Sequence, residues 1–138
     1  MNDWNDSIMA EFRANDGRLG GRWSGVHLLL LHTTGRTTGQ ERVSPMMYFR
    51  RGDVVYVIAS KAGAPTHPAW YLNLVADPHV SVELATTDGV ETWRGVAEPV
   101  SGPERERLFA EFTAVAPGFG AYQEGTDRVI PIVAVRRA

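Results

Sequence analysis

The sequence has no cysteine, a single lysine among its 14 basic residues, and no long apolar run. Without cysteine the chain has no disulfide framework, no thiolate metal site and no cysteine nucleophile. No apolar stretch approaches the roughly 20 residues of a membrane-spanning helix, and the first residues lack the basic start and apolar stretch of a signal peptide. The formal net charge of −2 argues against a nucleic-acid partner, since such proteins are usually basic. We expect a cytoplasmic protein.

The 138 residues have the length of one domain. Residues 1–22 are expected to be an N-terminal helical arm, because Trp4, Ile8 and Phe12 recur on one helical face. Further helices are predicted from Thr66, as N-cap, to Asp77-Pro78, and after Ser101, with a loop over 116–128. The predicted strands are 26–31, 42–50, 54–59, 80–84, 90–100 and 130–135.

Short connections between consecutive strands predict a mostly antiparallel sheet. Gly52-Asp53 and Thr87–Gly89 are typical hairpin turns. A doubly wound sheet would need helices between nearly all its strands, and they are absent. The pattern therefore predicts an α+β fold in which six strands form a small barrel with helices outside.

The usual catalytic constellations are missing from the sequence. No serine lies in a G-x-S-x-G strand–turn–helix elbow. The four histidines, His27, His32, His67 and His79, lack the spacing of metal ligands. We therefore expect neither a hydrolase nor a metal site.

Three polar segments could instead bind a ligand. In the turn Thr33–Arg42, glycines, hydroxyls and two arginines are suited to an anion, although turns also need glycine and threonine for their own geometry. Lys61 lies in a second loop, followed by Trp70 and Asn73 at the spacing of one helical face. In the third segment, Phe119 and Tyr122 could form a mobile lid or fasten the loop to the barrel.

Together these segments resemble the deazaflavin (coenzyme F420)-dependent nitroreductase family. The matching pieces follow one another over nearly the whole chain. They are Phe12-Arg13-Ala14-Asn15, Gly20-Gly21, Thr33-Thr34-Gly35-Arg36 through Gly39 and Arg42, Ala59-Ser60-Lys61-Ala62-Gly63-Ala64, Pro68-Ala69-Trp70-Tyr71-Leu72-Asn73-Leu74, Asp77-Pro78, Tyr122, Thr126-Asp127-Arg128 and Ile130-Pro131-Ile132-Val133. The resemblance implies a flavin-reductase-like split β-barrel that binds coenzyme F420.

The resemblance also implies roles for individual residues. Arg36, Arg42 and Lys61 would hold the phosphate and acidic glutamyl tail of the cofactor, and Trp70 and Asn73 would flank its ring. Tyr122 or Ser60 would donate a proton or hydrogen bond to the acceptor. The complete cofactor set is Arg36, Thr37, Thr38, Gly39, Arg42, Pro45, Met46, Met47, Tyr48, Ser60, Lys61, Ala62, Gly63, Trp70 and Asn73. The substrate set is Ser60, Ala116, Phe119 and Tyr122.

Two departures from the family pattern affect this interpretation. Thr37 stands where the family commonly has a lysine. Ala116 and Phe119 stand where the best-known nitroreductase members have tyrosines, so only Tyr122 is retained.

The resemblance implies reduction of an electron-poor small molecule, such as a quinone, an enone or lactone, or a nitro compound. The alternatives are a non-catalytic deazaflavin carrier and a split-barrel protein that binds FMN or haem. A homodimer and peripheral attachment of the first helix to the inner face of the membrane remain open. Packing of that helix on the barrel is favoured, because interfacial helices are typically rich in Lys and Arg and this one is acidic.

Overall fold

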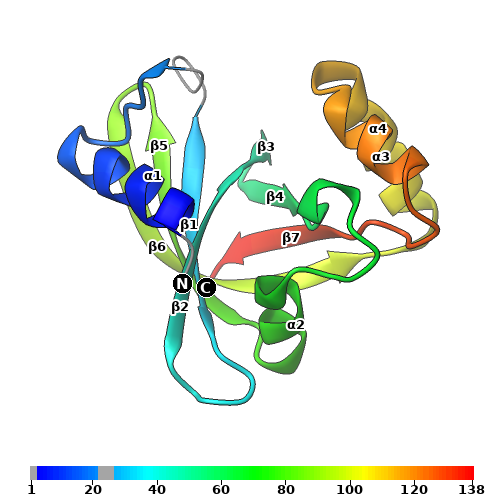
Figure 1. Cartoon of the computed structure of the whole chain (residues 1–138), viewed down its shortest axis with the longest axis horizontal. Helices are drawn as coiled ribbons and strands as arrows, with labels where there is room; N and C mark the ends of the chain where they lie inside the picture. The colour runs from blue at the N-terminus through cyan, green and yellow to red at the C-terminus, as the bar shows by residue number, and fades with distance from the viewer. Residues whose placement is uncertain (1–2, 22–26) are drawn as a thin grey trace.

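One antiparallel sheet organises the chain in the computed structural model, which describes residues 3–21 and 27–138. The strand order is β2-β1-β5-β6-β7-β4-β3, and all neighbouring pairs are antiparallel. Figure 1 shows α1 on one side of the sheet, α3 and α4 on the other, and α2 below. The elements are α1 (Asp3–Ala14), β1 (Leu28–Thr34), β2 (Glu41–Met47), β3 (Phe49–Arg51), β4 (Val54–Ile58), the 3₁₀ turn η2 (Lys61–Gly63), α2 (Ala69–Ala76), β5 (His79–Thr86), β6 (Gly89–Val100), α3 (Gly102–Val115), α4 (Gly118–Glu124) and β7 (Ile132–Arg137).

The expected α+β class and antiparallel sheet are confirmed, but the barrel differs from the expected one. The structure has seven strands, and the two edges of the sheet are not joined by a ladder of hydrogen bonds. The predicted strand over residues 42–50 is divided at Tyr48, because β2 pairs with β1 whereas β3 pairs with β4. The chain itself therefore links the two edge strands through Tyr48. The tyrosine hydroxyl donates to the carbonyl of Ala85 at 2.6 Å.

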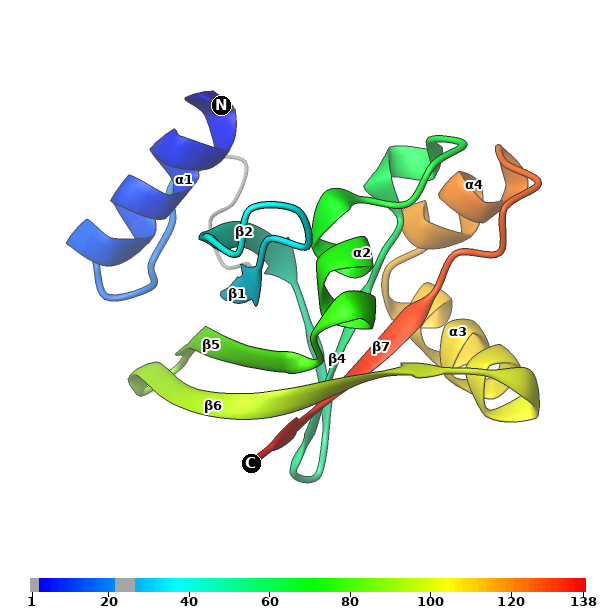
Figure 2. The ribbon, with the colours of Figure 1, turned by 90° about the horizontal axis from the view of Figure 1, so that it is seen from below.

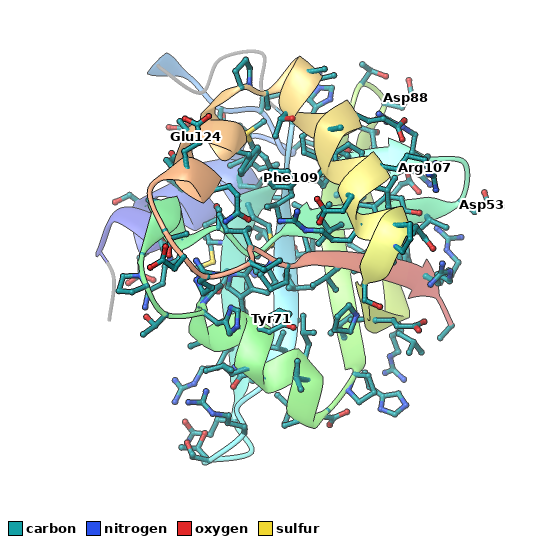
Figure 3. All side chains as sticks on the ribbon, turned by 90° about the vertical axis from the view of Figure 1, so that its right-hand side faces the viewer. Asp53, Tyr71, Asp88, Arg107, Phe109 and Glu124 are labelled. Carbon is teal, nitrogen blue, oxygen red and sulfur yellow. The ribbon has the colours of Figure 1, made fainter. Side chains whose placement is uncertain are left out.

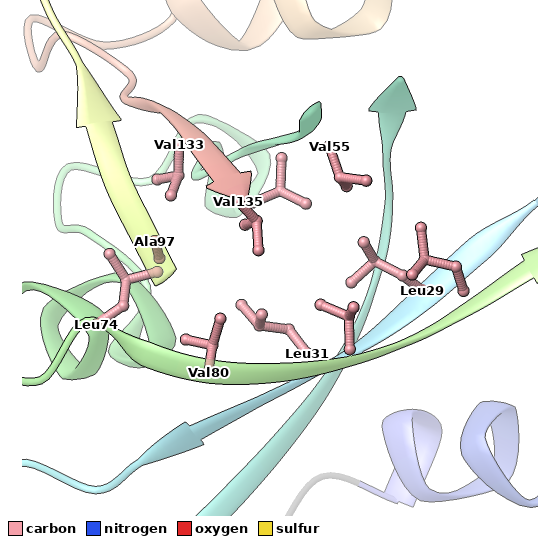
Figure 4. Packing of buried hydrophobic residues seen from close by; sticks show 11 residues of the cluster. Leu29, Leu31, Val55, Leu74, Val80, Ala97, Val133 and Val135 are labelled. Atoms are coloured by element: carbon pink, nitrogen blue, oxygen red, sulfur yellow. The ribbon is translucent and has the colours of Figure 1, made fainter. Parts of the chain in front are cut away.

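The continuous apolar run of β1 is explained by burial on both faces of the sheet. Leu29 and Leu31 point into a central cluster with Val55, Val80 and Val135 (Figure 4). The alternate residues, Leu28 and Leu30, pack in a second cluster with Ile8 and Phe12 of α1. Such two-sided burial removes the usual alternation of polar and apolar residues.

The N-terminal helix confirms the predicted packing face. Phe12 is 1% exposed and Ile8 is 7% exposed, both against β1 and β5. The side chain of Trp4 and the start of the first predicted strand at Val26 lie outside the described residues. Helix α1 therefore packs against the sheet.

Two local predictions were wrong. The helix after Thr66 begins instead at Ala69, following Pro68, and the threonine hydroxyl accepts a hydrogen bond from Lys61 Nζ at 3.1 Å. The segment expected to be a loop over 116–128 contains α4. Figure 3 shows α4 beside α3, with Phe109 on the side of α3 that faces α4 and Arg107 on the opposite side.

A third cluster lies beneath α3. Phe49 of β3 stacks on Phe112 of α3, with 4.3 Å between ring centroids, and Phe119 of α4 meets the edge of Phe49 at 6.2 Å. This packing holds α4 against the sheet despite its two glycines, which lower helix propensity.

Candidate functional site

The turn between β1 and β2 is narrow because Gly35 has no side chain. The Gly35 N–H donates to the carbonyl of Gln40 at 2.7 Å, and the N–H of Gly39 donates to the carbonyl of Gly35 at 2.8 Å. A Cβ atom at position 35 would lie 2.8 Å from Thr38 Oγ1 and 3.6 Å from Arg42 Nε. The missing side chain therefore lets Arg42 lie close to the turn backbone.

Asn73 of α2 connects that turn to the helix. Its side-chain oxygen accepts the backbone N–H of Arg36 at 3.1 Å, and its side-chain nitrogen donates to Thr33 Oγ1 at 3.2 Å. Asn73 is 4% exposed and Thr33 is 3% exposed. Both ends of the amide are satisfied, so the position of Arg36 is coupled to that of α2.

The turn, α2 and α1 surround an open cleft of about 800 Å³. Figure 2 shows α1, the turn, α2, the η2 segment and α4 following one another along one side of the molecule. Six of the predicted cofactor residues line the cleft together, namely Arg36, Thr37, Thr38, Arg42, Trp70 and Asn73. Sequence analysis missed the contribution of α1, which supplies Asn5, Asp6 and Met9.

The two arginines in this cleft form no ion pair with the residues that the structure describes. Within the described residues, the guanidinium groups of Arg36 and Arg42 make neither a salt bridge nor a hydrogen bond. Other arginines do form ion pairs, such as Arg13 with Glu83 at 3.1 Å and Arg50 with Glu91 at 2.8 Å. Two cations on the lining of one cleft, which Asp6 and Glu41 also line, are suited to an anionic ligand.

The predicted segment at the end of β2 presents alternate residues to opposite faces. Met46 and Tyr48 pack with Trp70 against the central cluster, whereas Met47 packs with the cluster beneath α1. Burial raises the pKa of the Tyr48 hydroxyl, and Arg50 opposes that rise. Pro45 lies opposite Leu30 on the edge strand, where its missing N–H is tolerated.

The second predicted loop lies apart from the arginines and next to α4. Lys61, Ala62 and Gly63 all have positive φ angles, of 47°, 54° and 80°. A Cβ on Gly63 would lie 2.9 Å from the carbonyl oxygen of Tyr122. The structure thus brings the Ser60–Gly63 loop and Tyr122 together. Lys61 does not line the arginine cleft.

The two hydroxyls expected to act as proton donors differ in exposure. Ser60 is 8% exposed, and Tyr122 is 38% exposed. Neither hydroxyl makes a hydrogen bond to the described residues. The remaining predicted residues lie away from the arginine cleft. Gly39 lines a separate hollow with His32 and His79, and Ala116 and Phe119 pack against the cluster beneath α3. The substrate role of Ala116 and Phe119 stays a prediction.

Two further residues of this region carried no role in the sequence interpretation. Arg128 donates hydrogen bonds to the loop carbonyls of Ala59, Ser60 and Ala64, and His67 lies beside its guanidinium. No spacing pattern could reveal these contacts, because more than 60 residues separate the partners. The sequence did hold a signal for α1. Burial of Ile8 and Phe12 against the sheet determines which neighbouring side of the helix can face the cleft.

The comparisons with known proteins agree on one family. A family model described as F420H(2)-dependent quinone reductase matches residues 4–137. The F420H(2)-dependent quinone reductase Rv1261c of Mycobacterium tuberculosis (strain ATCC 25618 / H37Rv) is 38% identical over 132 residues, which cover 93% of this chain and 86% of that protein.

Two solved structures resemble this one. The structure of an F420-H2 dependent reductase, FDR-A, is 35% identical, with a TM-score of 0.68 over 79% of this chain and 93% of that one. A structure described as a domain-swapped dimer is 32% identical, with a TM-score of 0.70 over 97% and 98% of the two chains.

Proposed function

This chain belongs to the F420H(2)-dependent quinone reductase family, and we propose that it transfers a hydride from reduced coenzyme F420 to a quinone. The observation that carries the proposal is the cleft whose two arginines form no ion pair within the described part of the chain. The cofactor's phosphate and glutamyl carboxylates need unneutralised cations. A family member without such a cation pair would bind that tail poorly.

The residues present fit the cofactor at both of its chemical ends. Arg36 and Arg42 would hold the anionic tail, with Thr38 as a hydroxyl donor. Trp70 offers an aromatic plane for a flat heterocycle, and Asn73 fixes the helix that carries it. The N–H groups of Lys61 and Ala62 donate no hydrogen bond within the described residues, so they are free to contact ring oxygens.

The chain itself supplies orientation and a proton. When bound, reduced F420 supplies the hydride, so the protein needs no nucleophile of its own. The Ser60 hydroxyl is buried and makes no hydrogen bond to the described residues, so it can donate one to a reduced acceptor. Tyr122 lies against the same loop and is the second candidate donor.

The decisive experiment mixes the protein with chemically reduced F420 and a soluble quinone without oxygen. The expected result is stoichiometric oxidation of the cofactor that depends on protein and quinone together. An enone and a nitro compound tested in parallel define the acceptor range. Binding of F420 with no oxidation by any acceptor would identify a carrier instead.

The proton donor is assigned by comparing Ser60→Ala with Tyr122→Phe. Loss of a donor that acts on the acceptor lowers kcat, typically by 10²-fold or more, and this loss should exceed any change in the affinity for F420. Unchanged turnover of Tyr122→Phe on every active acceptor would remove the tyrosine from this role.

We propose that the protein acts without inserting α1 into a membrane. None of the described helices is long and apolar enough to cross one. The apolar side of α1 is already covered, because Phe12 and Ile8 are buried against the sheet. Flotation with anionic liposomes should leave the protein at the bottom of the gradient, whereas flotation of the intact chain but not of a chain lacking residues 1–15 would show attachment through α1.

A homodimer is proposed from the domain-swapped dimer among the structural relatives. Light scattering of the purified protein should give twice the 15.2 kDa mass of one chain. A mass of one chain at micromolar concentration would contradict it.

A further inference from the structure

Arg128 holds the loop before α2 through its main chain. Its guanidinium donates to three carbonyl oxygens, those of Ala64 (from Nε, 3.0 Å), Ala59 (from Nη1, 3.0 Å) and Ser60 (from Nη2, 2.7 Å). Because these contacts involve backbone atoms, Arg128 constrains the path of the loop rather than a single side chain. The planar guanidinium is well suited to such multiple contacts.

The loop held by Arg128 is strained. Lys61 and Ala62 adopt the left-handed conformation, which is unfavourable for residues with a Cβ. Strain of this kind persists only where surrounding contacts enforce it, and it concentrates at functional sites. Here the enforcing contacts are Arg128 on one side and the packing of Gly63 against the Tyr122 backbone on the other.

Arg128 is itself fixed by a network of hydrogen bonds that reaches the buried Arg105. The Gln123 side chain donates to the carbonyl of Arg128 at 2.7 Å and accepts the N–H of Ile130 at 2.9 Å. Arg105, 6% exposed, donates to the same glutamine and to the carbonyl of Ile130. We call the contacts of Arg128 with the carbonyls of Ala59, Ser60 and Ala64 the clamp. Through Gln123 and Arg105 the clamp is connected to α3 and the core.

His67 completes the clamp and makes it sensitive to protonation. Arg128 Nη1 lies 3.0 Å from His67 Nδ1. Because Arg128 can only donate, this contact requires an unprotonated Nδ1 and a neutral ring. Tyr71 is the other titratable group in contact with His67, with 4.8 Å between ring centroids, and Lys61 bonds to the adjacent Thr66. Within the described residues, no carboxylate pairs with His67.

We propose that Arg128 is the positioning residue of the Ser60–Ala64 loop and that protonation of His67 releases this clamp, which weakens binding of the cofactor in mild acid. This inference rests on the proposed function, because it takes the loop as a cofactor contact. Desolvation and the charge of Arg128 hold the pKa of His67 below its ordinary 6.5, which agrees with a neutral ring in the clamp.

The positioning role is tested first on the protein without cofactor. Hydrogen exchange of the backbone amides over residues 59–66 is compared between wild type, Arg128→Lys and the control Arg136→Lys. Arg136 pairs at the surface with Glu98 and touches no part of the loop. Arg128→Lys keeps the charge but loses the planar set of donors, so exchange should rise about tenfold in this segment. Unchanged exchange would overturn the positioning role.

The titration is tested by calorimetric binding of F420 between pH 7.5 and 5.5 to wild type and His67→Asn. Asparagine keeps an acceptor oxygen that does not titrate. Wild type should lose at least threefold more affinity than His67→Asn on acidification, and the comparison cancels the titration of F420 itself. Parallel profiles would overturn the release by His67. Absence of F420 binding at every pH would contradict the proposed function, and the exchange result would still decide the role of Arg128.

Discussion

At the scale of single residues, the function depends on cations without partners. Arg36 and Arg42 line the cleft, and no carboxylate among the described side chains pairs with either of them, in a chain whose net charge is negative. An unpaired guanidinium contributes little to stability, but it gains a charge-assisted hydrogen bond when an anion binds. These two residues should therefore affect binding and stability very differently.

Arg36→Ala and Arg42→Ala should each weaken F420 binding by about 10- to 100-fold, since a hydrogen bond to a charged group is worth about 1.5–3 kcal/mol. Their free energies of unfolding should stay within about 0.5 kcal/mol of wild type. Isothermal titration and urea unfolding measure the two effects. Arg94→Ala is the control, because Arg94 is an exposed arginine that also forms no ion pair within residues 3–21 and 27–138. A loss of affinity in Arg94→Ala as large as in the cleft variants would refute a specific site.

Asn73 should show the opposite combination. Asn73→Ala leaves the Arg36 N–H and the Thr33 hydroxyl without their buried partner. Urea unfolding should detect a loss of about 1–3 kcal/mol. The exposed Asn15, whose side chain donates only to the carbonyl of Glu11, provides the control Asn15→Ala. Equal stability of the two variants would contradict the bridging role of Asn73.

At the scale of elements, the Lys61–Gly63 segment combines strain with close packing. Gly63→Ala would place a Cβ 2.9 Å from the Tyr122 carbonyl at a φ of +80° and should destabilise the protein by about 1–3 kcal/mol. Ala62→Gly relieves a left-handed alanine and should be neutral or stabilising by up to about 1 kcal/mol. Thermal unfolding of both variants measures the contrast. If both variants lower the melting temperature alike, the segment is not strained.

The attachment of α1 to the sheet should depend on pH through Glu83 of β5. Its carboxylate binds Arg13 at 3.1 Å and His32 Nε2 at 2.6 Å. Burial alone would raise the pKa of Glu83, but the hydrogen bonds from His32 and Arg13 outweigh it and lower the pKa below the ordinary 4.5. The stabilisation is therefore present above pH 4.5 and is lost as the pH falls through the lowered pKa.

Glu83→Gln should reduce stability at neutral pH and flatten the loss of stability below pH 4.5. The exposed Glu124 of α4 (Figure 3), which makes no ion pair with the described residues, gives the control Glu124→Gln. Chemical unfolding at a series of pH values measures both variants. An acid profile of Glu83→Gln that coincides with wild type would show that the ion pairs do not hold α1.

At the scale of the whole molecule, sequence patterns predicted the helices and strands better than they predicted which strands pair and which helices pack together. The hairpin turns and the stripe of Ile8 and Phe12 gave the antiparallel sheet and a packed first helix, because both depend on local periodicity. The division of one strand at Tyr48 could not be predicted, since it reflects a change of pairing partner between β1 and β4. Likewise, α4 forms through tertiary contacts of Phe119.

The candidate site shows the same limit. The pattern of glycines and arginines located the turn, and the spacing of Trp70 and Asn73 located the helix beside it, so six predicted residues meet in one cleft. Arg128 and His67 lie more than 60 residues apart in sequence, and no local pattern joins them. The part of the site formed by one continuous segment can thus be predicted from the sequence. Contacts between residues far apart in the sequence cannot.

Specific binding of a deazaflavin with an anionic tail is what the arginine cleft of this split barrel predicts. Its most direct test is a set of calorimetric titrations of the wild-type protein with F420, FMN and haem under identical conditions. Binding of F420 should be saturable and one-to-one, should weaken with salt because the cleft arginines carry the contact, and should be much tighter than binding of FMN or haem. Tight binding of FMN or haem with no measurable affinity for F420 would contradict it.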